Sequence, residues 1–509
     1  MSLIPVSRAL ISVYSKEGLD LLAKTLHHFG VEIYSTGGTQ DYLENLDIPV
    51  ISVESLTGYP SILDGRVKTL HPKVFGGILA RREKGHLSEL EQMEIPPFDL
   101  VVVDLYPFEE TVKSRADETE IIEKIDIGGI SLIRAAAKNF RDVVVCPSKS
   151  SYAYLINVLE RNTGATSLSD RLYLAKDAFA VTSHYDTAIF QYFQGEQTLT
   201  RHLRISENAS IDLRYGENPH QKAVYYGEFD AMFEKIAGKE LSFNNLTDID
   251  AAVGLISEFR SDNPTMAILK HTNPCGVATR NTIREAWLAA LEADPVSAFG
   301  GIFISNVKID LETASEIDQL FYEVLIAPEF DEDAIHLLTK KKNRILLKIK
   351  KLEIQNIRVK SLLNGVIVQE NDVVTEEREN CRIVTTMEPT EDQWKDLIFA
   401  ARCCKHLKSN VIVLAKNNQL LGMGCGQTSR IDALEQAILK AKKYGFDLEG
   451  AAMASDAFFP FPDCVEMADH AGIKAVIQPG GSVKDEESIA YCEANKMTMV
   501  LTGIRHFRH

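Results

Sequence analysis

The 509-residue chain lacks the features that would place it in a membrane, on a nucleic acid or in an oxidising compartment. No apolar run approaches the ~18 residues of a membrane span, and residues 1–7 lack the basic-then-apolar order of a signal peptide. The eight cysteines form no C-x-x-C pair, which is typical of a reducing compartment with mostly buried thiols. A net charge of −17 argues against broad nucleic-acid or anionic-membrane binding. These absences predict a cytoplasmic protein with no nucleic-acid or membrane partner.

The length and the order of apolar segments indicate an α/β protein with more than one domain. A single core stops growing at about 250–300 residues, so one core is not enough for this chain. Up to about residue 150, short β-branched strands alternate with helices, which predicts a parallel sheet covered on both faces. New motifs begin after residue 200, so we expect domains at 1–200 and 201–509. The basic stretch 340–351 is typical of an edge strand or a surface helix.

Two glycine turns in the first domain each stand between a strand and a helix. Thr36-Gly37-Gly38-Thr39 follows a strand and precedes a helix expected to begin near Gln40. Residues 126–129 (Asp-Ile-Gly-Gly) repeat the arrangement before a helix expected over 131–139. In α/β sheets, ligands collect at the carboxyl ends of strands, where helix N-termini present free amides. One such turn is commonly structural, whereas two together favour an anion site.

Basic and acidic groups lie between these turns. Residues 65–73 contain Arg66, Lys68, His71 and Lys73, an unusual density of basic groups in so acidic a chain. Tyr106 comes two residues after Asp104, which ends a buried strand. Taken with the glycine turns, these residues predict a phosphate pocket that contains a lysine, a tyrosine and an aspartate.

The segments 35–39, 65–72, 125–129 and 134–139 together resemble the inosine monophosphate (IMP) cyclohydrolase domain of the bifunctional purine-biosynthesis enzyme family, which has a methylglyoxal-synthase-like fold. The resemblance implies closure of the last purine ring, with catalytic roles for Lys68, Tyr106, Asp126 and Lys138. It also implies that phosphate and ribose are held by Ser12, Ser35, Gly37, Gly38, Thr39, Arg66, Thr69, Gly128 and Gly129. The family's first loop often reads Ser-Asp-Lys, whereas this chain has Tyr14-Ser15-Lys16, so no aspartate contact is expected from that loop.

A second set of motifs occupies the C-terminal part. Residues 270–276 (Lys-His-Thr-Asn-Pro-Cys-Gly) follow an apolar strand, and we expect a Pro-Cys-Gly turn there with the histidine as a base. Residues 214–221, 294–301 and 455–463 combine charged groups, glycines and aromatic rings. The aromatic cluster at 458–461 is compatible with core packing and also with a flat conjugated ligand.

These motifs, with 408–410, 426–430 and the ending 505–509, resemble the aminoimidazole carboxamide ribonucleotide (AICAR) transformylase domain of the same family. The resemblance implies formyl transfer from 10-formyltetrahydrofolate to the 5-amine of AICAR, with His271 as base and Lys270 orienting it or supplying positive charge. It further implies cytidine-deaminase-like subdomains, a homodimer, no catalytic metal, and a ligand site formed by Arg214, Tyr215, Asn244, Gly300, Glu323, Asn410, Phe458, Asp463 and Arg505.

Three alternatives stay open on the residues alone. Pro274-Cys275 beside a histidine suggests a zinc deaminase, although the paired cysteine would fall at Ala278. A non-catalytic regulatory module could keep the phosphate pocket without chemistry, although Lys68, Tyr106 and Lys138 speak against it. A methylglyoxal-synthase-like lyase would need no second domain.

Overall fold

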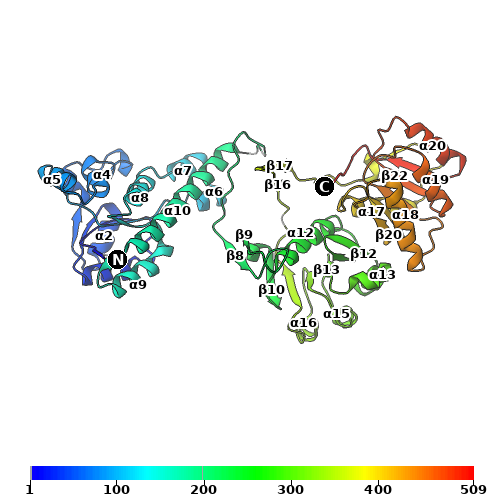
Figure 1. Ribbon diagram of the computed structural model, residues 1–509, viewed down its shortest axis with the longest axis horizontal. Helices are drawn as coiled ribbons and strands as arrows, with labels where there is room; N and C mark the ends of the chain where they lie inside the picture. Colours follow the sequence, from blue (N-terminus) through cyan, green and yellow to red (C-terminus); the bar gives the residue numbers. More distant parts are fainter. Residues whose placement is uncertain (1–2, 196, 198, 353) are drawn as a thin grey trace. The chain divides into compact units, whose positions relative to one another are not determined.

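The computed structural model describes residues 3–195, 197, 199–352 and 354–509 (Figure 1). The chain divides into two compact units, Met1–Asn208 and Ala209–His509. No helix among the described residues is long and apolar enough to cross a membrane.

The described part of the first unit is built on a five-stranded sheet in the order β4-β3-β2-β5-β6, and each neighbouring pair is parallel. The strands are short and rich in buried Val, Ile and Leu: β2 (Arg8–Ser12), β3 (Glu32–Ser35), β4 (Val50–Ser52), β5 (Leu100–Val103) and β6 (Val144–Cys146). The predicted parallel sheet is confirmed. From β2 the chain builds outward to β4, and from β5 it builds outward to β6 on the other side. The order therefore reverses between β2 and β5.

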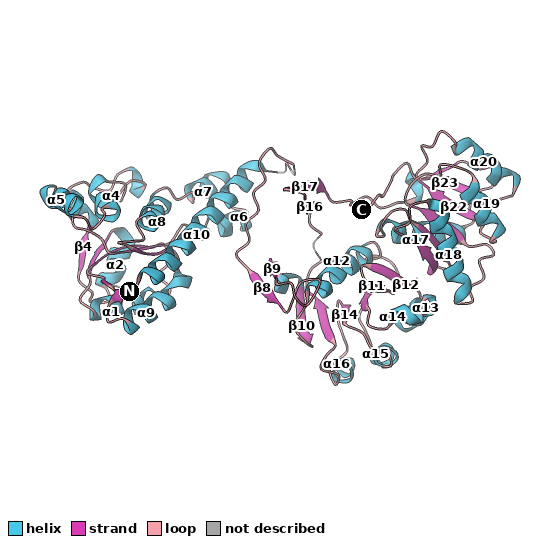
Figure 2. Ribbon diagram, in the orientation of Figure 1, coloured by secondary structure: helices cyan, strands magenta, loops and turns pink. Residues whose placement is uncertain are grey.

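Helices surround this sheet in the first unit (Figure 2). α8 packs on β5, β6 and α10, and α1 packs on α9. The helices are α1 (Leu19–His28), α2 (Gly37–Glu44), α3 (Val53–Thr57), α4 (Pro72–Leu79), α5 (Lys84–Gln92), α6 (Phe108–Lys113), α7 (Glu118–Glu123), α8 (Gly128–Lys138), α9 (Tyr152–Arg161) and α10 (Leu168–Gln194). A two-stranded ladder, β1 (Ile4–Pro5) with β7 (Ala165–Thr166), lies beside them.

The second unit is a larger mixed α/β region, as predicted. Its described residues contain a twelve-stranded sheet in the order β10-β15-β14-β13-β11-β12-β20-β19-β21-β22-β23-β18. Each half of this order has an antiparallel outer strand, three parallel strands and an antiparallel hairpin. The hairpins β11–β12 and β19–β20 meet at the middle, where Ala278 of β12 pairs with Gln419 of β20. The two halves therefore repeat one arrangement.

The elements of the second unit have the following bounds. The sheet strands are β10 (Phe233–Ala237), β11 (Thr265–Lys270), β12 (Asn273–Thr279), β13 (Ile302–Ser305), β14 (Val324–Ala327), β15 (Ile345–Ile349), β18 (Arg382–Ile383), β19 (Ile412–Lys416), β20 (Gln419–Gly424), β21 (Ala452–Ser455), β22 (Ala475–Gln478) and β23 (Thr498–Leu501). The helices are α11 (Phe229–Met232), α12 (Phe243–Ser257), α13 (Ile283–Ala293), α14 (Pro295–Ala298), α15 (Leu311–Asp318), α16 (Glu332–Leu338), α17 (Glu391–Lys405), α18 (Arg430–Lys443), α19 (Asp463–His470) and α20 (Asp485–Ala494). Two separate hairpins are β8 (Ser210–Leu213) with β9 (Ala223–Tyr226) and β16 (Ile357–Leu362) with β17 (Gly365–Glu370).

The Pro-Cys-Gly turn expected at 274–276 is wrong, because these residues belong to β12. Gly276 is needed there for close packing: a Cβ would come 1.9 Å from the carbonyl oxygen of Ala290 on α13. Gly424 of β20 has the matching contact, 2.0 Å from the carbonyl oxygen of Ala433 on α18. Each central hairpin thus uses a glycine to bring its helix onto the strand.

The basic stretch 340–351 is also not an edge strand or a surface helix. It contains β15, which lies between β10 and β14. Ile345, Leu346 and Leu347 are buried. Ile345 and Leu347 belong to the core cluster that contains residues of α12 and α17, and Leu346 belongs to the cluster that contains residues of α13 and α16.

Candidate functional site

The reversal of strand order between β2 and β5 marks the ligand side of the first unit. In open α/β sheets the crevice at such a switch point lies beyond the carboxyl ends of the strands. Ser12 ends β2 and Ser35 ends β3, while Asp104 and Tyr106 follow β5. The parallel register brings these ends to one edge of the sheet.

Asp104 joins the loops that follow β2 and β5. Its carboxylate accepts hydrogen bonds from the amides of Tyr14 and Ser15, the latter at 2.9 Å. The first loop lacks the family's aspartate, and Asp104 supplies a carboxylate at that loop. Lys16 extends from the loop and donates to the Thr39 hydroxyl at 3.1 Å. The Thr39 hydroxyl in turn donates to the Val13 carbonyl at 2.8 Å, so the loop is tied to α2.

The start of α2 is arranged for an anion. The helix begins at Gly37, three residues before the predicted start, so both glycines contribute helix N-terminal amides. The Thr36 hydroxyl donates to Glu54 at 2.6 Å and makes no capping hydrogen bond to α2. Gly37 and Gly38 are exposed, and a Cβ on Gly37 would lie 3.5 Å from Lys68 Nζ. Accessible amides beside a lysine are suited to an anion such as phosphate.

Asp126 lies at the neighbouring helix start. Its carboxylate accepts from the Gly129 amide at 2.6 Å, and its own amide donates to the Tyr185 hydroxyl at 2.8 Å. A Cβ on Gly129 would lie 2.7 Å from Asp126 Oδ2, and a Cβ on Gly128 would lie 3.3 Å from Thr69 Oγ1. The two glycines therefore admit Asp126 and Thr69 at close range.

Burial changes the pKa values of these groups. Burial raises the pKa of Asp126, and the charge of Asp104 raises it further, while the Gly129 and Tyr106 amides and Lys68 oppose the rise. Burial and the nearby Asp126 raise the pKa of Tyr106. Burial lowers the pKa of Lys16, and Lys68 adds to that effect, against the attraction of Asp104. Shifted pKa values of this kind are found at functional sites.

Three residues that were predicted for this site make no side-chain hydrogen bond or ion pair with the other predicted site residues in the described part of the chain. Arg66 forms an ion pair with Glu123 on the surface. The Ser35 side chain is buried and donates to the Ile11 carbonyl at 2.7 Å, so this hydroxyl is already used as a donor. Lys138 is exposed at the last residue of α8, about 15 Å along the helix axis from Gly128. The described contacts do not bring Lys138 to the other catalytic candidates, and its role stays a prediction.

In the second unit His271 lies at the tip of the β11–β12 hairpin. Lys270 pairs with Asn273, so His271 and Thr272 form a two-residue turn. Both are in the left-handed region, with φ of 51° and 65°. The Thr272 amide donates to Asp248 on α12 at 2.7 Å. His271 is exposed, which is compatible with its predicted role as a base.

Lys270 lies beside predicted binding residues. Its Nζ donates to the Phe299 carbonyl at 2.7 Å, directly before Gly300. The Glu323 amide donates to the Gly301 carbonyl at 3.0 Å, and the Glu323 carboxylate pairs with Lys239 at 2.5 Å. Lys270, Gly300 and Glu323 thus belong to one end of neighbouring strands. Lys239 is an additional cation that the motifs did not indicate.

A second group lies at the same end of the sheet, around Asn410. The Asn410 side chain donates to the Gln427 carbonyl at 3.0 Å. Arg430 contacts buried Asp456 at 3.4 Å, two residues before Phe458. Phe459 is fully buried and belongs to the core, whereas the Phe458 and Phe461 rings are partly exposed. Only the exposed rings are available to a flat ligand.

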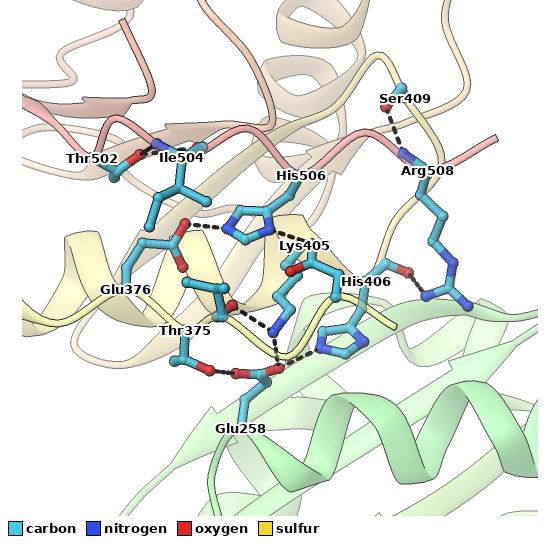
Figure 3. A network of polar contacts seen from close by, with 12 residues as sticks. Glu258, Thr375, Glu376, Lys405, His406, Ser409, Thr502, Ile504, His506 and Arg508 are labelled. Carbon is cyan, nitrogen blue, oxygen red and sulfur yellow. Dashed lines mark hydrogen bonds and ion pairs between the residues drawn. The ribbon is translucent and has the colours of Figure 1, made fainter. Parts of the chain in front are cut away.

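The C-terminal segment is fixed beside this group (Figure 3). Buried His506 bonds to Asp372 at 2.5 Å and to Glu376 at 2.7 Å. Arg508 donates to the His406 carbonyl at 3.1 Å. Arg505 is exposed, with its guanidinium 4.4 Å from the Phe507 ring. The buried histidine holds the segment, and the arginine that precedes it stays available.

The remaining predicted residues are exposed or partly so. Arg214 stacks over the Tyr215 ring at 5.3 Å, and Asn244 at the start of α12 donates to the Glu217 carbonyl at 3.2 Å. Asp463 is exposed at the start of α19. In the part of the chain that the structure describes, no hydrogen bond or ion pair joins these residues to His271.

Comparison with known families identifies the chain. The AICARFT/IMPCHase bienzyme family matches residues 136–440, and the MGS-like domain family matches residues 18–131. The chain belongs to the AICARFT/IMPCHase bienzyme family. The family resemblance inferred from the motifs is thereby confirmed.

Relatives of this AICARFT/IMPCHase bienzyme align along almost the whole chain. The bifunctional purine biosynthesis protein PurH of Bacteroides thetaiotaomicron is 57% identical over 505 residues and covers 99% of both chains. PurH of Aquifex aeolicus is 48% identical, over 99% of this chain and 100% of its own. PurH of Acetivibrio thermocellus is 46% identical, again over 99% and 100%. A solved structure, titled Crystal structure of ForH, is 33% identical over 37% of this chain and 99% of its own, with a TM-score of 0.33.

As an AICARFT/IMPCHase bienzyme, the chain is an AICAR formyltransferase and an IMP cyclohydrolase of purine biosynthesis. Its formyl donor is 10-formyltetrahydrofolate. The lyase and regulatory alternatives are set aside because the match includes both parts of the bienzyme.

Cys275 is buried, and burial raises the pKa of its thiol to about 12. Among the described residues no group of three or more His, Cys, Asp or Glu could hold a metal ion.

Proposed function

We propose that the first unit closes the purine ring and the second transfers the formyl group, so that the predicted domains 1–200 and 201–509 each carry one activity. The observation that supports this most strongly is the meeting of Lys68, Asp126 and the open N-terminus of α2 at the switch point of the first sheet. The exposed His271 beside Lys270 is the corresponding feature of the second unit.

In ring closure, the carboxamide nitrogen of the formamido nucleotide attacks the formyl carbon. A C–N bond forms and the carboxamide nitrogen loses one proton, which leaves a hydroxyl on the former formyl carbon. The formamido nitrogen then loses its proton as the C=N bond forms, and the oxygen, which has taken up two protons in all, leaves as water. Lys68 stabilises the developing oxyanion, Asp126 accepts the nitrogen proton, and Tyr106 is the nearby O–H donor. Lys138 remains a candidate for a proton transfer. The reaction is intramolecular, so holding the nucleotide folded contributes to the rate.

Nucleotide binding in the first unit is proposed to use amides more than side chains. The phosphate binds at the start of α2, to Gly37 and Gly38, with Thr39 close by. Thr69, Gly128 and Gly129 border the ribose. Ser12 and Ser35 define the strand ends on which these groups rest, and Arg66 would have to leave Glu123 to reach the nucleotide.

In formyl transfer, the 5-amine attacks the formyl carbon of 10-formyltetrahydrofolate. The C–N bond to folate N10 breaks, the amine loses a proton, and N10 gains one. His271 accepts the amine proton because an imidazole titrates near neutrality. Lys270 supplies positive charge near N10. The nucleotide and folate are proposed to contact Arg214, Tyr215, Asn244, Gly300, Glu323, Asn410, Phe458, Asp463 and Arg505.

A homodimer in the cytoplasm completes the proposal. The β16–β17 hairpin exposes Val359, Val366 and Ile367, and no hydrophobic core cluster of the described residues contains it. An isolated two-stranded hairpin is marginally stable in water, so a second copy of the chain is the expected cover. All eight cysteines are free, which supports a reducing compartment.

The test separates the two activities by substitution. His271→Ala is expected to lower formyl transfer by about 10²- to 10⁴-fold while cyclisation of supplied formamido nucleotide continues. Lys68→Ala is expected to lower cyclisation by about 10²- to 10³-fold while tetrahydrofolate is still released. Asn417→Ala is a matched control, since Asn417 has a φ of 55° at the tip of the other hairpin. Loss of both activities in one folded variant would refute the proposal.

A further inference from the structure

The turn formed by His271 and Thr272 is strained, because neither residue favours the backbone conformation that it adopts. A non-glycine residue in the left-handed region is strained, and a β-branched residue such as Thr272 is a clear outlier there. The two-residue hairpin needs both residues in this region. Something outside the turn must therefore hold it.

Asp248 is the group that holds the turn. It is the sixth residue of α12, a helix that packs on β11 (Figure 2). Its carboxylate accepts the Thr272 amide at 2.7 Å. Burial raises the pKa of Asp248, against the opposing effect of the Thr272 and His271 amides and the His271 charge. The carboxylate thus lies within reach of both turn amides.

In the second half of the sheet, an aspartate on a helix holds the corresponding hairpin turn in the same way, and that turn contains no histidine. Asp396 is the sixth residue of α17, and its carboxylate accepts the amides of Asn417 and Asn418 at 3.0 and 2.7 Å. These two residues form the β19–β20 turn, with φ of 55° and 51°. Asparagine tolerates the left-handed region well. One hairpin has asparagines, which are suited to its turn, whereas the other has His and Thr.

In the described part of the chain, no hydrogen bond to either ring nitrogen of His271 fixes the direction of the imidazole. The hydrogen bonds of this residue run through its backbone: the carbonyl accepts from Thr272 and Asn273, and the amide lies toward Asp248. The direction of the ring is therefore set by the turn, and the turn is held by Asp248.

We propose that Asp248 is the positioning residue of the formyl-transfer site, which acts through the backbone of the His271–Thr272 turn to aim the imidazole at the 5-amine. This inference rests on the proposed role of His271. It assigns no contact between Asp248 and either substrate.

The test compares Asp248→Ala with Asp396→Ala in the full chain, because both remove the same contact from the same place in a repeated structure. Asp248→Ala is expected to lower the formyl-transfer kcat by about 10- to 100-fold, with the KM for each substrate within about twofold and cyclisation unchanged. Asp396→Ala is expected to leave kcat unchanged at a similar loss of stability. If Asp248→Ala does not fold, Asp248→Asn and Asp396→Asn replace the pair, with the same sign and a smaller effect.

Two further variants show whether Asp248 acts through the turn and the histidine. Thr272→Asn copies Asn418 and should restore part of the kcat lost in Asp248→Ala, because asparagine relieves the strain. Adding Asp248→Ala to His271→Ala should cause no further loss. Equal kcat losses in the Asp248 and Asp396 variants, or no rescue by Thr272→Asn, would overturn this inference alone. Normal formyl transfer in His271→Ala would instead overturn the proposed function.

Discussion

At the scale of single residues, two aspartates at opposite ends of β5 make the same backbone contacts with different consequences. Asp99 accepts the amides of Ser7 and Arg8, each at 3.0 Å, and pairs with Arg82. Asp104 accepts the amides of Tyr14 and Ser15 on the ligand side. Burial raises the pKa of Asp104, and the amides of Tyr14 and Ser15 and the charge of Lys16 only partly oppose this rise. Asp99 therefore anchors the sheet, whereas the charge of Asp104 also acts on Asp126.

The substitution Asp104→Asn should change the pH dependence of cyclisation. The charge of Asp104 raises the pKa of Asp126, so its removal lowers that pKa. Asp126 then keeps its ionised form at lower pH, and the acidic limb of the kcat profile moves toward acid. The profile is measured with supplied formamido nucleotide.

Asp99→Asn is the control for this experiment, because it weakens two equivalent amide contacts far from the pocket along β5. It should lower stability and leave the acidic limb in place. An acidic limb that does not move in Asp104→Asn, or that moves equally in both variants, would exclude Asp104 from the electrostatics of the site.

The sequence predicted the positions of some site residues but not the contacts of others. Lys68, Asp126 and the glycines that admit them were predicted from local motifs, and the structure brings them together. The contacts of Asp104 and Asp248 were not predicted, because their partners lie 90 and 24 positions away in the chain. Such pairings depend on strand order and helix packing, which no local pattern contains.

At the scale of secondary-structure elements, the sequence showed where glycines are needed but not which structural role each glycine has. The glycines at 37–38 and 128–129 were expected to form turns before helices, yet they are the first residues of α2 and α8. Their amides are therefore helix N-terminal donors. Gly276 was expected in a turn but permits α13 to approach β12. The sequence shows where the glycines lie, and only the packing of the neighbouring elements shows the reason for each of them.

The attachment of the C-terminal segment depends on the positive charge of one residue, His506. His506 lies between Asp372 and Glu376. Burial lowers the pKa of His506, but the bonds to these carboxylates outweigh it and raise the pKa from 6.5 to about 9. A folded-state pKa above the unfolded value gives stability that is complete below about pH 6.5 and is lost as the pH rises through about 9. The shift corresponds to about 3 kcal/mol.

Unfolding of the second unit should therefore become easier between pH 6.5 and 9, and His506→Gln should remove most of this pH dependence. Trp287 and Trp394 are the two tryptophans of the chain, and both belong to the second unit. Their fluorescence during urea unfolding of the full chain reports on this unit. Parallel pH dependence in the wild type and in His506→Gln would contradict the assignment of this charge to His506.

At the scale of the whole molecule, two units with unrelated sheets carry two motif sets on one chain. The motif order was enough to predict the family and both activities, since the motifs that carry the resemblance are short and local. The twelve-stranded sheet was not predicted, because its halves share turn geometry and strand order more than residue identity. Its centre, the β12–β20 pairing, joins segments about 140 residues apart and leaves no local pattern.

The central claim is that ring closure and formyl transfer occur at separate sites, and a mixing assay tests it most directly. Lys68→Ala and His271→Ala are supplied with AICAR and 10-formyltetrahydrofolate, separately and as an equimolar mixture, and tetrahydrofolate and IMP are followed independently. Alone, Lys68→Ala should release tetrahydrofolate without IMP, and His271→Ala should release neither. The mixture should form IMP, because one variant makes the formamido nucleotide and the other closes its ring. A mixture of folded variants that forms no IMP while formamido nucleotide accumulates would contradict separate sites.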